Sequence, residues 1–346
     1  MIQISPETQL FIREHSSDDV RALALQAKKY PDINMPTAIT QIAGRQVAAE
    51  KIPSWREIEE IWYPKHLSLE QCSSEITARY KARLFQGDSL IDLTGGFGID
   101  CSFLATGFKT ATYVERQEEL CEIAAHNFPI LNLNHINVRN EDGVAYLQSM
   151  SPVDCIFLDP ARRNEHGGKT VAISDCEPNV AELEALLLSK ANRVMIKLSP
   201  MLDLSLALKE LKHTQEIHIL SVNNECKELL ILLGQTSPAE IAIHCVNLLT
   251  KGTQEEQHLV FTREQEQRSQ CTYTDSLGNY LYEPNASLLK AGAFRSIAAA
   301  YPVRKLHPNS HLYTSDSFIE NFPGRIFRIV NQCSFNKKEV KENLAD

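Results

Sequence analysis

The sequence predicts a doubly wound α/β fold with a helical N-terminal part and a small α+β C-terminal part. Between residues 87 and 237, short apolar runs alternate with helix-length segments. Strands that alternate with helices are typical of βαβ units, which build a parallel sheet covered on both faces. Residues 1–86 carry helical patterns instead, and residues 238–346 mix strand-like runs with a helix. We therefore expect three domains with these boundaries.

Helix signals dominate the first 86 residues. Residues 17–19 read as a helix N-cap, and Pro36 and Pro53 each stand where a first helical turn can begin. Apolar residues within 55–62 recur at helical spacing, which predicts a packing stripe on one helix face. A further helix is predicted over about residues 70–85.

The central part contains seven strand-like runs. They comprise residues 90–93, 110–114, 136–138, 154–158, 194–198, 217–222 and 229–233. The last two runs are too close together for a helical crossover, so they should pair antiparallel. The expected sheet therefore has seven strands, of which the last is antiparallel.

Past residue 238 the pattern is mixed. Residues 241–249 and 258–262 look like strands, and residues 287–300 look like a helix of small residues. We assign all three to the small C-terminal domain, with the boundary at the turn-forming segment 235–238.

Composition excludes several classes of protein. The chain has 346 residues, of which 43% are apolar, and this is too many for wholesale disorder. No apolar run approaches the roughly 20 residues of a membrane helix, and the N-terminus lacks a signal-peptide pattern, so we expect a cytoplasmic protein without a membrane partner. The nine cysteines form no C-x-x-C pair, which leaves zinc-ribbon and dithiol redox sites without support. His307 and His311 have no metal-ligand partners at a recognisable spacing, and we expect no metal.

Charge is distributed unevenly. The net charge is −9, yet residues 285–346 carry nine Lys/Arg and five Asp/Glu, a net of +4. A basic C-terminal part on an acidic body permits local contact with an anionic partner. Ordinary variation of surface charge explains the same count.

A glycine-rich loop follows the first predicted strand and opens a helix. It reads D-L-T-G-G-F-G-I-D, and its candidate ligand-binding residues are Asp92, Thr94, Gly95, Gly96, Gly98 and Asp100. Glycines there allow a tight turn and let a ligand approach without a Cβ in the way. Strand, loop and helix come in the order that such a site requires.

Acidic residues follow the next three strands. Glu115 ends the second, 19 residues after Gly96, where doubly wound folds bind a ribose diol. Asp142 and Gly143 follow the third, and Asp159 follows the fourth. A helix cap or a solvated loop explains any one of these acids alone. Because parallel strands end at one edge of the sheet, four successive strands ending in such elements predict a shared ligand site.

The loop spacing is G-G-x-G. A dinucleotide site has G-x-G-x-x-G, and no glycine follows here at its last position, where the helix packs against the strand. Together the four motifs, D-L-T-G-G-F-G-I-D, Glu115, N-E-D-G and D-P-A-R, resemble those of class I S-adenosylmethionine-dependent methyltransferases over about residues 88–236. The resemblance implies a Rossmann-like sheet and S-adenosyl-L-methionine as cofactor. Carried over by motif, the residues from Asp92 to Gly98 would surround the methionine part, and Glu115 would bind the ribose. Asp142 would face the adenine amine, and Asp159 would lie beside the point of methyl transfer. Asp100 and Gly143, within the same motifs, are further candidates for cofactor binding.

The wider arrangement resembles a bacterial group of these enzymes. Its members share a Q-C-S-S-E-x-T-A-R-Y-K-like segment (here 71–81), D-P-A-R-R, and K-L-S-P-M-L-D (here 197–203). A ferredoxin-like domain and a THUMP-like tail follow in that group. Here the chain stops in what reads as a starting helix at 337–346, so we expect the tail to be cut short. THUMP-type modules imply RNA as the partner.

The fourth motif narrows the chemistry. Enzymes that methylate base amines commonly show [DN]-P-P-[YFW], whereas Ala161 and Arg162 follow Asp159 and Pro160 here. Arginine can stack on a base or grip phosphate. We take Asp159, Pro160 and Arg162 as the catalytic candidates. The alternative for Arg162 and its neighbour Arg163 is pairing with nearby acids such as Asp175 or Glu177.

D-P-A-R also looks like the D-P-P-R of enzymes that methylate a pyrimidine carbon. Those need a cysteine nucleophile after the fifth strand, where this chain has Ser199, a poorer nucleophile. Cys155 is predicted to be core, so carbon methylation is disfavoured. Lys197 either faces the pocket or is a strand-end lysine, and residues 166–168 form either a lid or a plain loop.

These motifs favour an S-adenosylmethionine-dependent methyltransferase that modifies RNA at a nitrogen. One alternative is an RNA-binding protein of the same fold that has lost catalysis, as the altered fourth motif would allow. Another is a methyltransferase of small molecules or proteins, which the overall acidity favours because RNA binding usually needs an extensive basic face.

Overall fold

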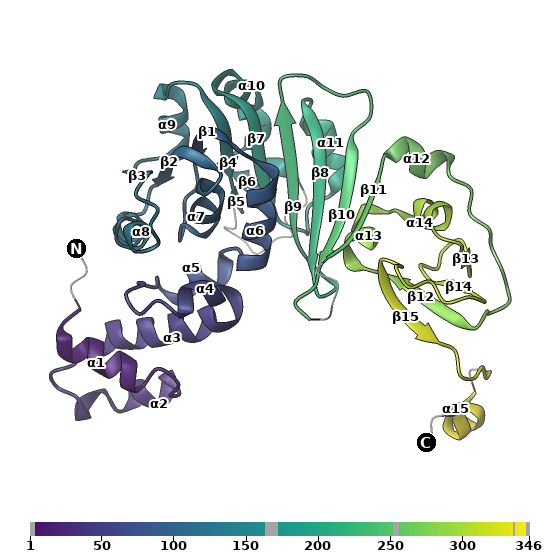
Figure 1. The fold of residues 1–346 in the computed structure, drawn as a ribbon, viewed down its shortest axis with the longest axis horizontal. Coiled ribbons are helices and arrows are strands. Elements are labelled where there is room, and N and C mark those ends of the chain that lie inside the picture. Colours follow the sequence, from purple (N-terminus) through teal and green to yellow (C-terminus); the bar gives the residue numbers. More distant parts are fainter. Residues whose placement is uncertain (1–3, 163–171, 252–255, 335, 344–346) are drawn as a thin grey trace. The chain divides into compact units, whose positions relative to one another are not determined.

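The computed structural model describes residues 4–162, 172–251, 256–334 and 336–343 (Figure 1). The chain divides into two compact units. The first contains residues 1–197 and 232–235, and the second contains residues 198–231 and 236–346. Strand β9 supplies residues to both units.

The helices are α1 (Pro6–Glu14), α2 (Val20–Leu25), the 3-10 helix η1 (Ala27–Lys29), α3 (Met35–Lys51), α4 (Pro53–Arg56), α5 (His66–Gln71), α6 (Glu75–Leu84), α7 (Ile99–Ala105), α8 (Glu118–Ile130), α9 (Gly143–Ser149), the 3-10 helix η2 (Ile173–Asp175), α10 (Val180–Lys190), α11 (Leu204–Glu210), α12 (Arg263–Arg268), α13 (Ala286–Ala291), α14 (Phe294–Ala300) and α15 (Lys337–Asn343). The strands are β1 (Gly87–Asp92), β2 (Phe108–Glu115), β3 (Ile136–Asn140), β4 (Val153–Leu158), β5 (Ala161–Arg162), β6 (Cys176–Glu177), β7 (Ala191–Leu198), β8 (Thr214–Val222), β9 (Glu225–Gly234), β10 (Ala242–Leu248), β11 (Glu256–Phe261), β12 (Tyr280–Pro284), β13 (Arg304–Lys305), β14 (Tyr313–Ser315) and β15 (Gly324–Arg328).

The large sheet has the strand order β11-β10-β8-β9-β7-β4-β1-β2-β3. Strands β1, β2, β3, β4 and β7 are parallel. Leu90 of β1 stands opposite Ala111 of β2 and Cys155 of β4. Asn223 and Asn224 join β8 to the neighbouring β9, both with positive φ. Two left-handed residues in a two-residue turn are typical of a type I′ hairpin, so β9 runs antiparallel to β8. This confirms the predicted parallel sheet with an antiparallel seventh strand.

The sheet has nine strands, not the expected seven. Strand β10 pairs parallel with β8, and β11 pairs antiparallel with β10. The runs at 241–249 and 258–262 are strands as predicted, but they extend the large sheet. A strand's apolar pattern reports how its faces are buried and carries no information about its pairing partner, so the sequence could not assign these strands to a sheet.

The N-terminal helices confirm most of the predicted signals. Asp19 accepts hydrogen bonds from the first turn of α2, and Pro36 and Pro53 lie in the first turns of α3 and α4. The expected helical stripe over 55–62 is wrong, because α4 ends at Arg56. Those apolar side chains instead pack in an irregular segment, within a core cluster that includes Phe97.

The C-terminal sheet has the order β13-β14-β12-β15, and its adjacent strands are antiparallel. The single helix expected over 287–300 is two helices, α13 and α14. Gly292 caps α13 with φ of 74°, a left-handed conformation that ends a helix.

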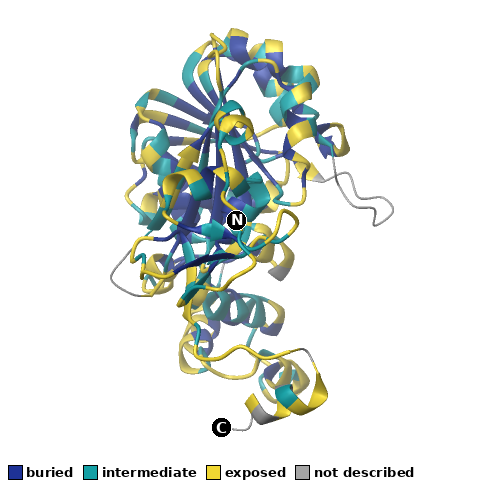
Figure 2. Cartoon of the chain, turned by 90° about the vertical axis from the view of Figure 1, so that its right-hand side faces the viewer, coloured by how far each residue is buried: buried dark blue, intermediate teal, exposed yellow. Residues whose placement is uncertain are grey.

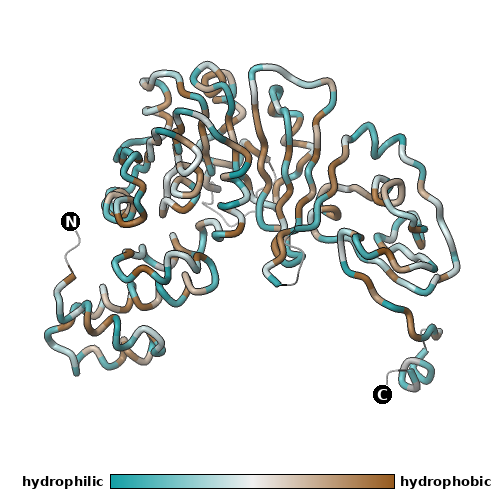
Figure 3. Tube along the Cα trace, viewed as in Figure 1, coloured by the Kyte–Doolittle hydropathy of each residue, from teal (hydrophilic) through white to brown (hydrophobic). Residues whose placement is uncertain are grey.

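Buried residues follow the strands of the large sheet (Figure 2), and apolar residues concentrate in the same strands (Figure 3). No helix in the described part of the chain is both long and apolar enough to span a bilayer.

Candidate active site at the carboxyl ends of the strands

The glycine loop connects β1 to α7. Gly96 and Gly98 have φ of 53° and 86°, the left-handed region in which glycine carries no steric cost. Gly98 is the N-cap of α7. Phe97 between them packs edge-on against Trp55, with ring centroids 5.3 Å apart. The loop is therefore attached to the core of the N-terminal helices.

Two further glycines allow close approaches. A Cβ on Gly95 would lie 2.2 Å from the ring of Tyr113, whose hydroxyl donates to the Gly96 carbonyl at 2.5 Å. A Cβ on Gly143 would lie 2.2 Å from the Leu93 carbonyl oxygen. Tyr113, which has no predicted role, therefore packs against the glycine loop and donates a hydrogen bond to it. Gly143 lets the loop after β3 approach the loop after β1.

We expect Gly143→Ala to lower the free energy of unfolding by about 2–3 kcal/mol, because backbone atoms must move to admit the methyl group. Gly96→Ala is the matched control. It adds a methyl group at a left-handed residue, 3.7 Å from the Thr94 carbonyl oxygen and so without a clash, at a cost of about 1 kcal/mol. Urea unfolding of both variants measures the difference. Equal losses would show that the close approach at Gly143 is not limiting.

Glu115 ends β2 and is buried. Its Oε2 accepts a hydrogen bond from the Gly96 N–H at 2.9 Å, and its Oε1 accepts one from the Gln117 N–H at 2.8 Å. Both oxygens are thus oriented by backbone donors beside the glycine loop. A carboxylate has about four lone-pair sites, so each oxygen retains capacity for a ligand hydroxyl.

Asp92 and Thr94 join the ends of β1 and β4. The Thr94 hydroxyl accepts a hydrogen bond from the Asp159 N–H at 2.6 Å and lies 3.5 Å from Asp92 Oδ1, which also accepts from the Thr94 N–H at 3.0 Å. Burial raises the pKa of Asp92 to about 8, and the nearby carboxylates act in the same direction. Asp92 is therefore largely protonated at neutral pH.

Asp142 is the N-cap of α9. Its Oδ1 accepts hydrogen bonds from the backbone N–H groups of Val144 and Ala145, each at 3.0 Å. The Asp142 side chain therefore caps α9, which is one of the two explanations that the sequence offers for this acid. Contact with adenine stays a prediction for Asp142 and Gly143.

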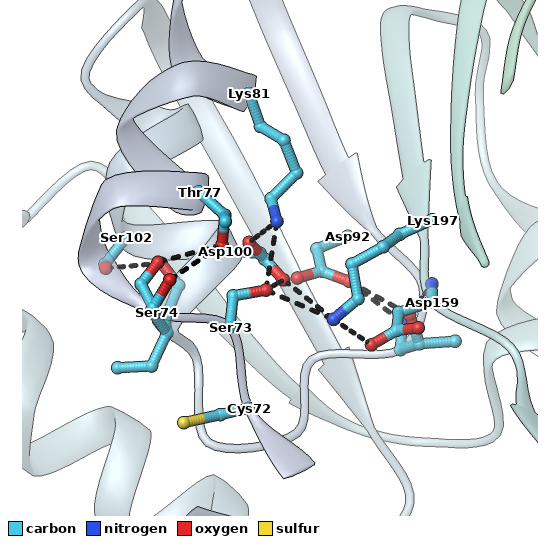
Figure 4. A network of polar contacts seen from close by, with 12 residues as sticks. Cys72, Ser73, Ser74, Thr77, Lys81, Asp92, Asp100, Ser102, Asp159 and Lys197 are labelled. Atoms are coloured by element: carbon cyan, nitrogen blue, oxygen red, sulfur yellow. Dashed lines mark hydrogen bonds and ion pairs between the residues drawn. The ribbon is translucent and has the colours of Figure 1, made fainter. Parts of the chain in front are cut away.

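Asp159 follows β4, and its Oδ2 lies 2.5 Å from Lys197 Nζ at the end of β7 (Figure 4). Lys197 is only 8% exposed, and its Nζ also donates to Ser73 Oγ at 3.1 Å. Of the two possibilities for Lys197, facing the pocket or being an ordinary strand-end lysine, the structure places it against the predicted catalytic carboxylate. Pro160 is buried directly after Asp159.

Asp100 lies in the first turn of α7 between two lysines. Its Oδ1 is 3.0 Å from Lys81 Nζ, and its Oδ2 is 3.5 Å from Lys197 Nζ and accepts from Ser73 Oγ at 2.7 Å. Burial alone would raise the pKa of Asp100, but the two ammonium groups and the Ser73 hydroxyl lower it below its ordinary value. Figure 4 shows Lys81 reaching this carboxylate from α6.

Ser73 and Lys81 have no predicted role, although both lie in the segment 71–81. A signal was present. Thr77, Ala78 and Lys81 stand at helical spacing on the buried face of α6, so helical periodicity places a lysine on a buried face. A lysine in that place requires a buried anion, because an unpaired buried charge is costly.

Arg162 pairs through its backbone with Cys176, in the short β5–β6 ladder. Of the alternative partners, Glu177 pairs with Arg116 at 3.3 Å and Asp175 accepts from the Ala172 N–H. Arg163 and the candidate lid at 166–168 lie outside the described residues. Cys155 is buried within β4, as predicted.

Comparisons with known proteins agree with this geometry. Residues 56–164 match the family model of protein-L-isoaspartate(D-aspartate) O-methyltransferase, and residues 280–323 match that of a ferredoxin-like domain. A crystal structure described as a "putative methyltransferase from Porphyromonas gingivalis W83" is 34% identical, covers 100% of this chain and 87% of its own, and superposes with a TM-score of 0.85.

Other solved structures are more distant. A modification subunit of a "putative type I restriction enzyme" from Vibrio vulnificus YJ016 is 12% identical over 58% of this chain and 56% of its own (TM-score 0.40). An rRNA methylase from Streptococcus thermophilus is 14% identical over 46% and 94% (TM-score 0.34). Comparison with curated proteins finds no match. On the full-length likeness at 34% identity, the chain belongs to the methyltransferase family of the Porphyromonas gingivalis protein, with a ferredoxin-like domain after the methyltransferase core.

Proposed function

We propose that this protein transfers a methyl group from S-adenosyl-L-methionine to a nitrogen of RNA. The observation that carries the proposal is the Glu115 carboxylate, which the Gly96 and Gln117 N–H groups orient beside the glycine loop. A ribose diol donates two hydrogen bonds, and a carboxylate held at the end of the second strand accepts both. S-adenosyl-L-methionine supplies an electrophilic methyl group on a positively charged sulfur.

The other predicted cofactor-binding residues surround the same strand ends. Asp92, Thr94, Gly95, Gly96 and Gly98 would meet the methionine part. Asp142 and Gly143 would meet the adenine through the loop after β3. We propose that Asp100 acts on this region indirectly, because its carboxylate is already held by Lys81, Lys197 and Ser73.

Asp159 and Pro160 would position the acceptor. A base amine donates hydrogen bonds to the Asp159 carboxylate and to the Pro160 carbonyl oxygen, which aims the nitrogen at the methyl carbon. The nitrogen would bond to the methyl carbon as the carbon–sulfur bond breaks, which would leave S-adenosylhomocysteine, and the nitrogen would release its proton to solvent. Because Asp159 is ion-paired with Lys197 at 2.5 Å, we assign it an orienting role more than a basic one. Position supplies most of the acceleration in such a displacement.

RNA as substrate is supported by charge. Residues 285–346 carry a net charge of +4 on a chain of −9, and they include most of the segment that matches the ferredoxin-like domain. Arg162 follows the proposed catalytic Asp159 in sequence, and a guanidinium group there can stack on a base or bind phosphate.

Cofactor binding tests the first half of the proposal. We expect S-adenosylmethionine and S-adenosylhomocysteine to raise the melting temperature of the wild type, and Gly96→Arg to abolish this rise by filling the loop. Gly96→Ala imposes the same backbone strain with much less bulk and should weaken binding less than Gly96→Arg. A wild type that binds neither compound, by thermal shift or calorimetry, would refute the cofactor assignment.

Methyl transfer tests the second half. Radiolabelled S-adenosylmethionine is supplied with total RNA, protein and metabolites from cells lacking this protein. We expect label in RNA, and a loss of about 100-fold in Asp159→Ala, in line with the loss when reacting groups are misplaced by about 1 Å. Asp88→Ala, which removes an exposed ion pair with Lys109, is the matched control and should leave transfer unchanged.

The net charge of −9 favours one other candidate, a methyltransferase of proteins or small molecules. It predicts label in the protein or metabolite fraction. It also predicts that acceptor binding depends weakly on salt, whereas RNA binding should fall steeply as salt rises.

A further inference from the structure

A cluster of three histidines and a glutamate lies within the second unit, outside the proposed active site. Glu216 and His218 are on β8, His244 is on β10 and His258 is on β11. His218 stands opposite His244 in the parallel pair, and His258 stands opposite Val246, two residues from His244. Because side chains alternate along a strand, all four point to the same face of the sheet.

The ring and carboxylate atoms of this cluster are close together. One ligand atom each from Glu216, His218 and His244 lies within 4.8 Å of the others. His218 Nε2 is 3.3 Å from Glu216 Oε2, and His244 Nδ1 is 3.2 Å from His258 Nε2. The His218 side chain is buried, so at least one residue of the cluster is shielded from solvent by its neighbours.

We propose that Glu216, His218, His244 and His258 bind a divalent transition-metal ion of the zinc class. Three imidazoles and one carboxylate make a nitrogen-rich, oxygen-containing ligand set, which suits Zn²⁺ better than Ca²⁺ or Mg²⁺, since those ions prefer oxygen. Four protein ligands are the usual number at a structural zinc site.

Binding requires a small rearrangement. Tetrahedral zinc with bonds of about 2.0–2.1 Å places its ligand atoms about 3.4 Å apart. The ligand atoms of Glu216, His218 and His244 lie within 4.8 Å of one another, so they must move closer together to bind one ion. The His218 and His244 rings are stacked at 4.3 Å with an interplanar angle of 17°, and at least one must turn for both nitrogens to face one ion. Such rotations leave the backbone register unchanged.

The sequence does not reveal this ligand set, because its members do not form a compact motif. Glu216 and His218 are two residues apart, but His244 and His258 follow 26 and 14 residues later. Only the pairing of three adjacent strands brings them together. An ion there would link β11, at the edge of the large sheet, to β10 and β8.

Zinc titration of the metal-free protein against a chromogenic chelator tests the proposal. We expect one Zn²⁺ per chain, with affinity reduced at least tenfold in His244→Ala and in His258→Ala. His311→Ala removes an exposed histidine stacked on Phe294 and should have no effect. His258→Ala lies on the edge strand and serves if His244→Ala does not fold, as judged by circular dichroism.

Cobalt substitution identifies the ligands. Tetrahedral Co²⁺ bound by nitrogen and oxygen shows visible bands without the near-ultraviolet charge transfer of thiolate ligands. The absence of saturable binding, unchanged affinity in His244→Ala and His258→Ala, or a thiolate signature from the cysteines would each overturn the proposal. None of these readouts depends on methyl transfer.

Discussion

Asp100→Ala is expected to lower the free energy of unfolding by about 3–5 kcal/mol, the usual loss when one partner of a buried ion pair is removed. The substitution takes away the carboxylate between Lys81, which is fully buried, and Lys197, which is 8% exposed. Both ammonium groups then remain in a poorly solvated site with less negative charge beside them. Urea unfolding at pH 7 measures the loss.

Two variants make this result interpretable. Asp88→Ala removes a carboxylate 2.8 Å from Lys109, where both side chains are more than 70% exposed, and should change stability by less than about 1 kcal/mol. Asp100→Asn keeps the shape and one hydrogen-bond acceptor and should fall between the two. If Asp100→Ala lowered the free energy of unfolding no more than Asp88→Ala, the ion pairs of Asp100 with Lys81 and Lys197 would not stabilise the fold as we infer.

Asp92→Asn is expected to flatten the pH dependence of stability. In the folded protein burial raises the pKa of Asp92 to about 8, from an ordinary value of 3.8. Between these two values the folded state holds a proton that the unfolded state has lost. Wild-type stability therefore falls as pH rises from about 4 to about 8, by on the order of 5 kcal/mol from this group. Asparagine is neutral throughout and lacks this contribution.

Urea unfolding of both proteins at several pH values from 5 to 8 gives the comparison. The wild type should lose stability relative to Asp92→Asn by about 1.4 kcal/mol per pH unit within this window. Asparagine can still accept the Thr94 N–H bond, so the variant should remain folded. Parallel pH profiles for the two proteins would show that Asp92 is ionised in the folded state.

The sequence predicted the parts of this protein that local patterns encode. The alternation of strands and helices predicted the parallel sheet. The motif order predicted that the glycine loop and Glu115 lie together, and the Gly96 N–H donates a hydrogen bond to the Glu115 carboxylate. These succeed because motif order along a doubly wound chain determines which strand ends are neighbours. The break at Gly292 was missed because a glycine among small residues does not by itself show a left-handed conformation.

Other features depend on contacts between segments distant in sequence. Lys81 and Asp100 are 19 residues apart on different helices, and no local pattern pairs them. Asp142 was read as a ligand residue, and its hydrogen bonds to the first turn of α9 depend on a backbone conformation that periodicity does not report. The addition of β10 and β11 to the large sheet is of the same kind.

The ammonium group that Lys81 contributes from α6 has a consequence for the use of this protein in fragments. A shortened chain starting at β1 would contain every motif that marks the fold as a methyltransferase. It would lack Lys81, one of the two cations beside Asp100, and the Trp55 ring against Phe97, and it would leave the buried acid with Lys197 alone and the Phe97 ring more exposed to water. The smallest autonomous catalytic module therefore has to include the preceding helices, and a swap of cores between relatives must carry them along.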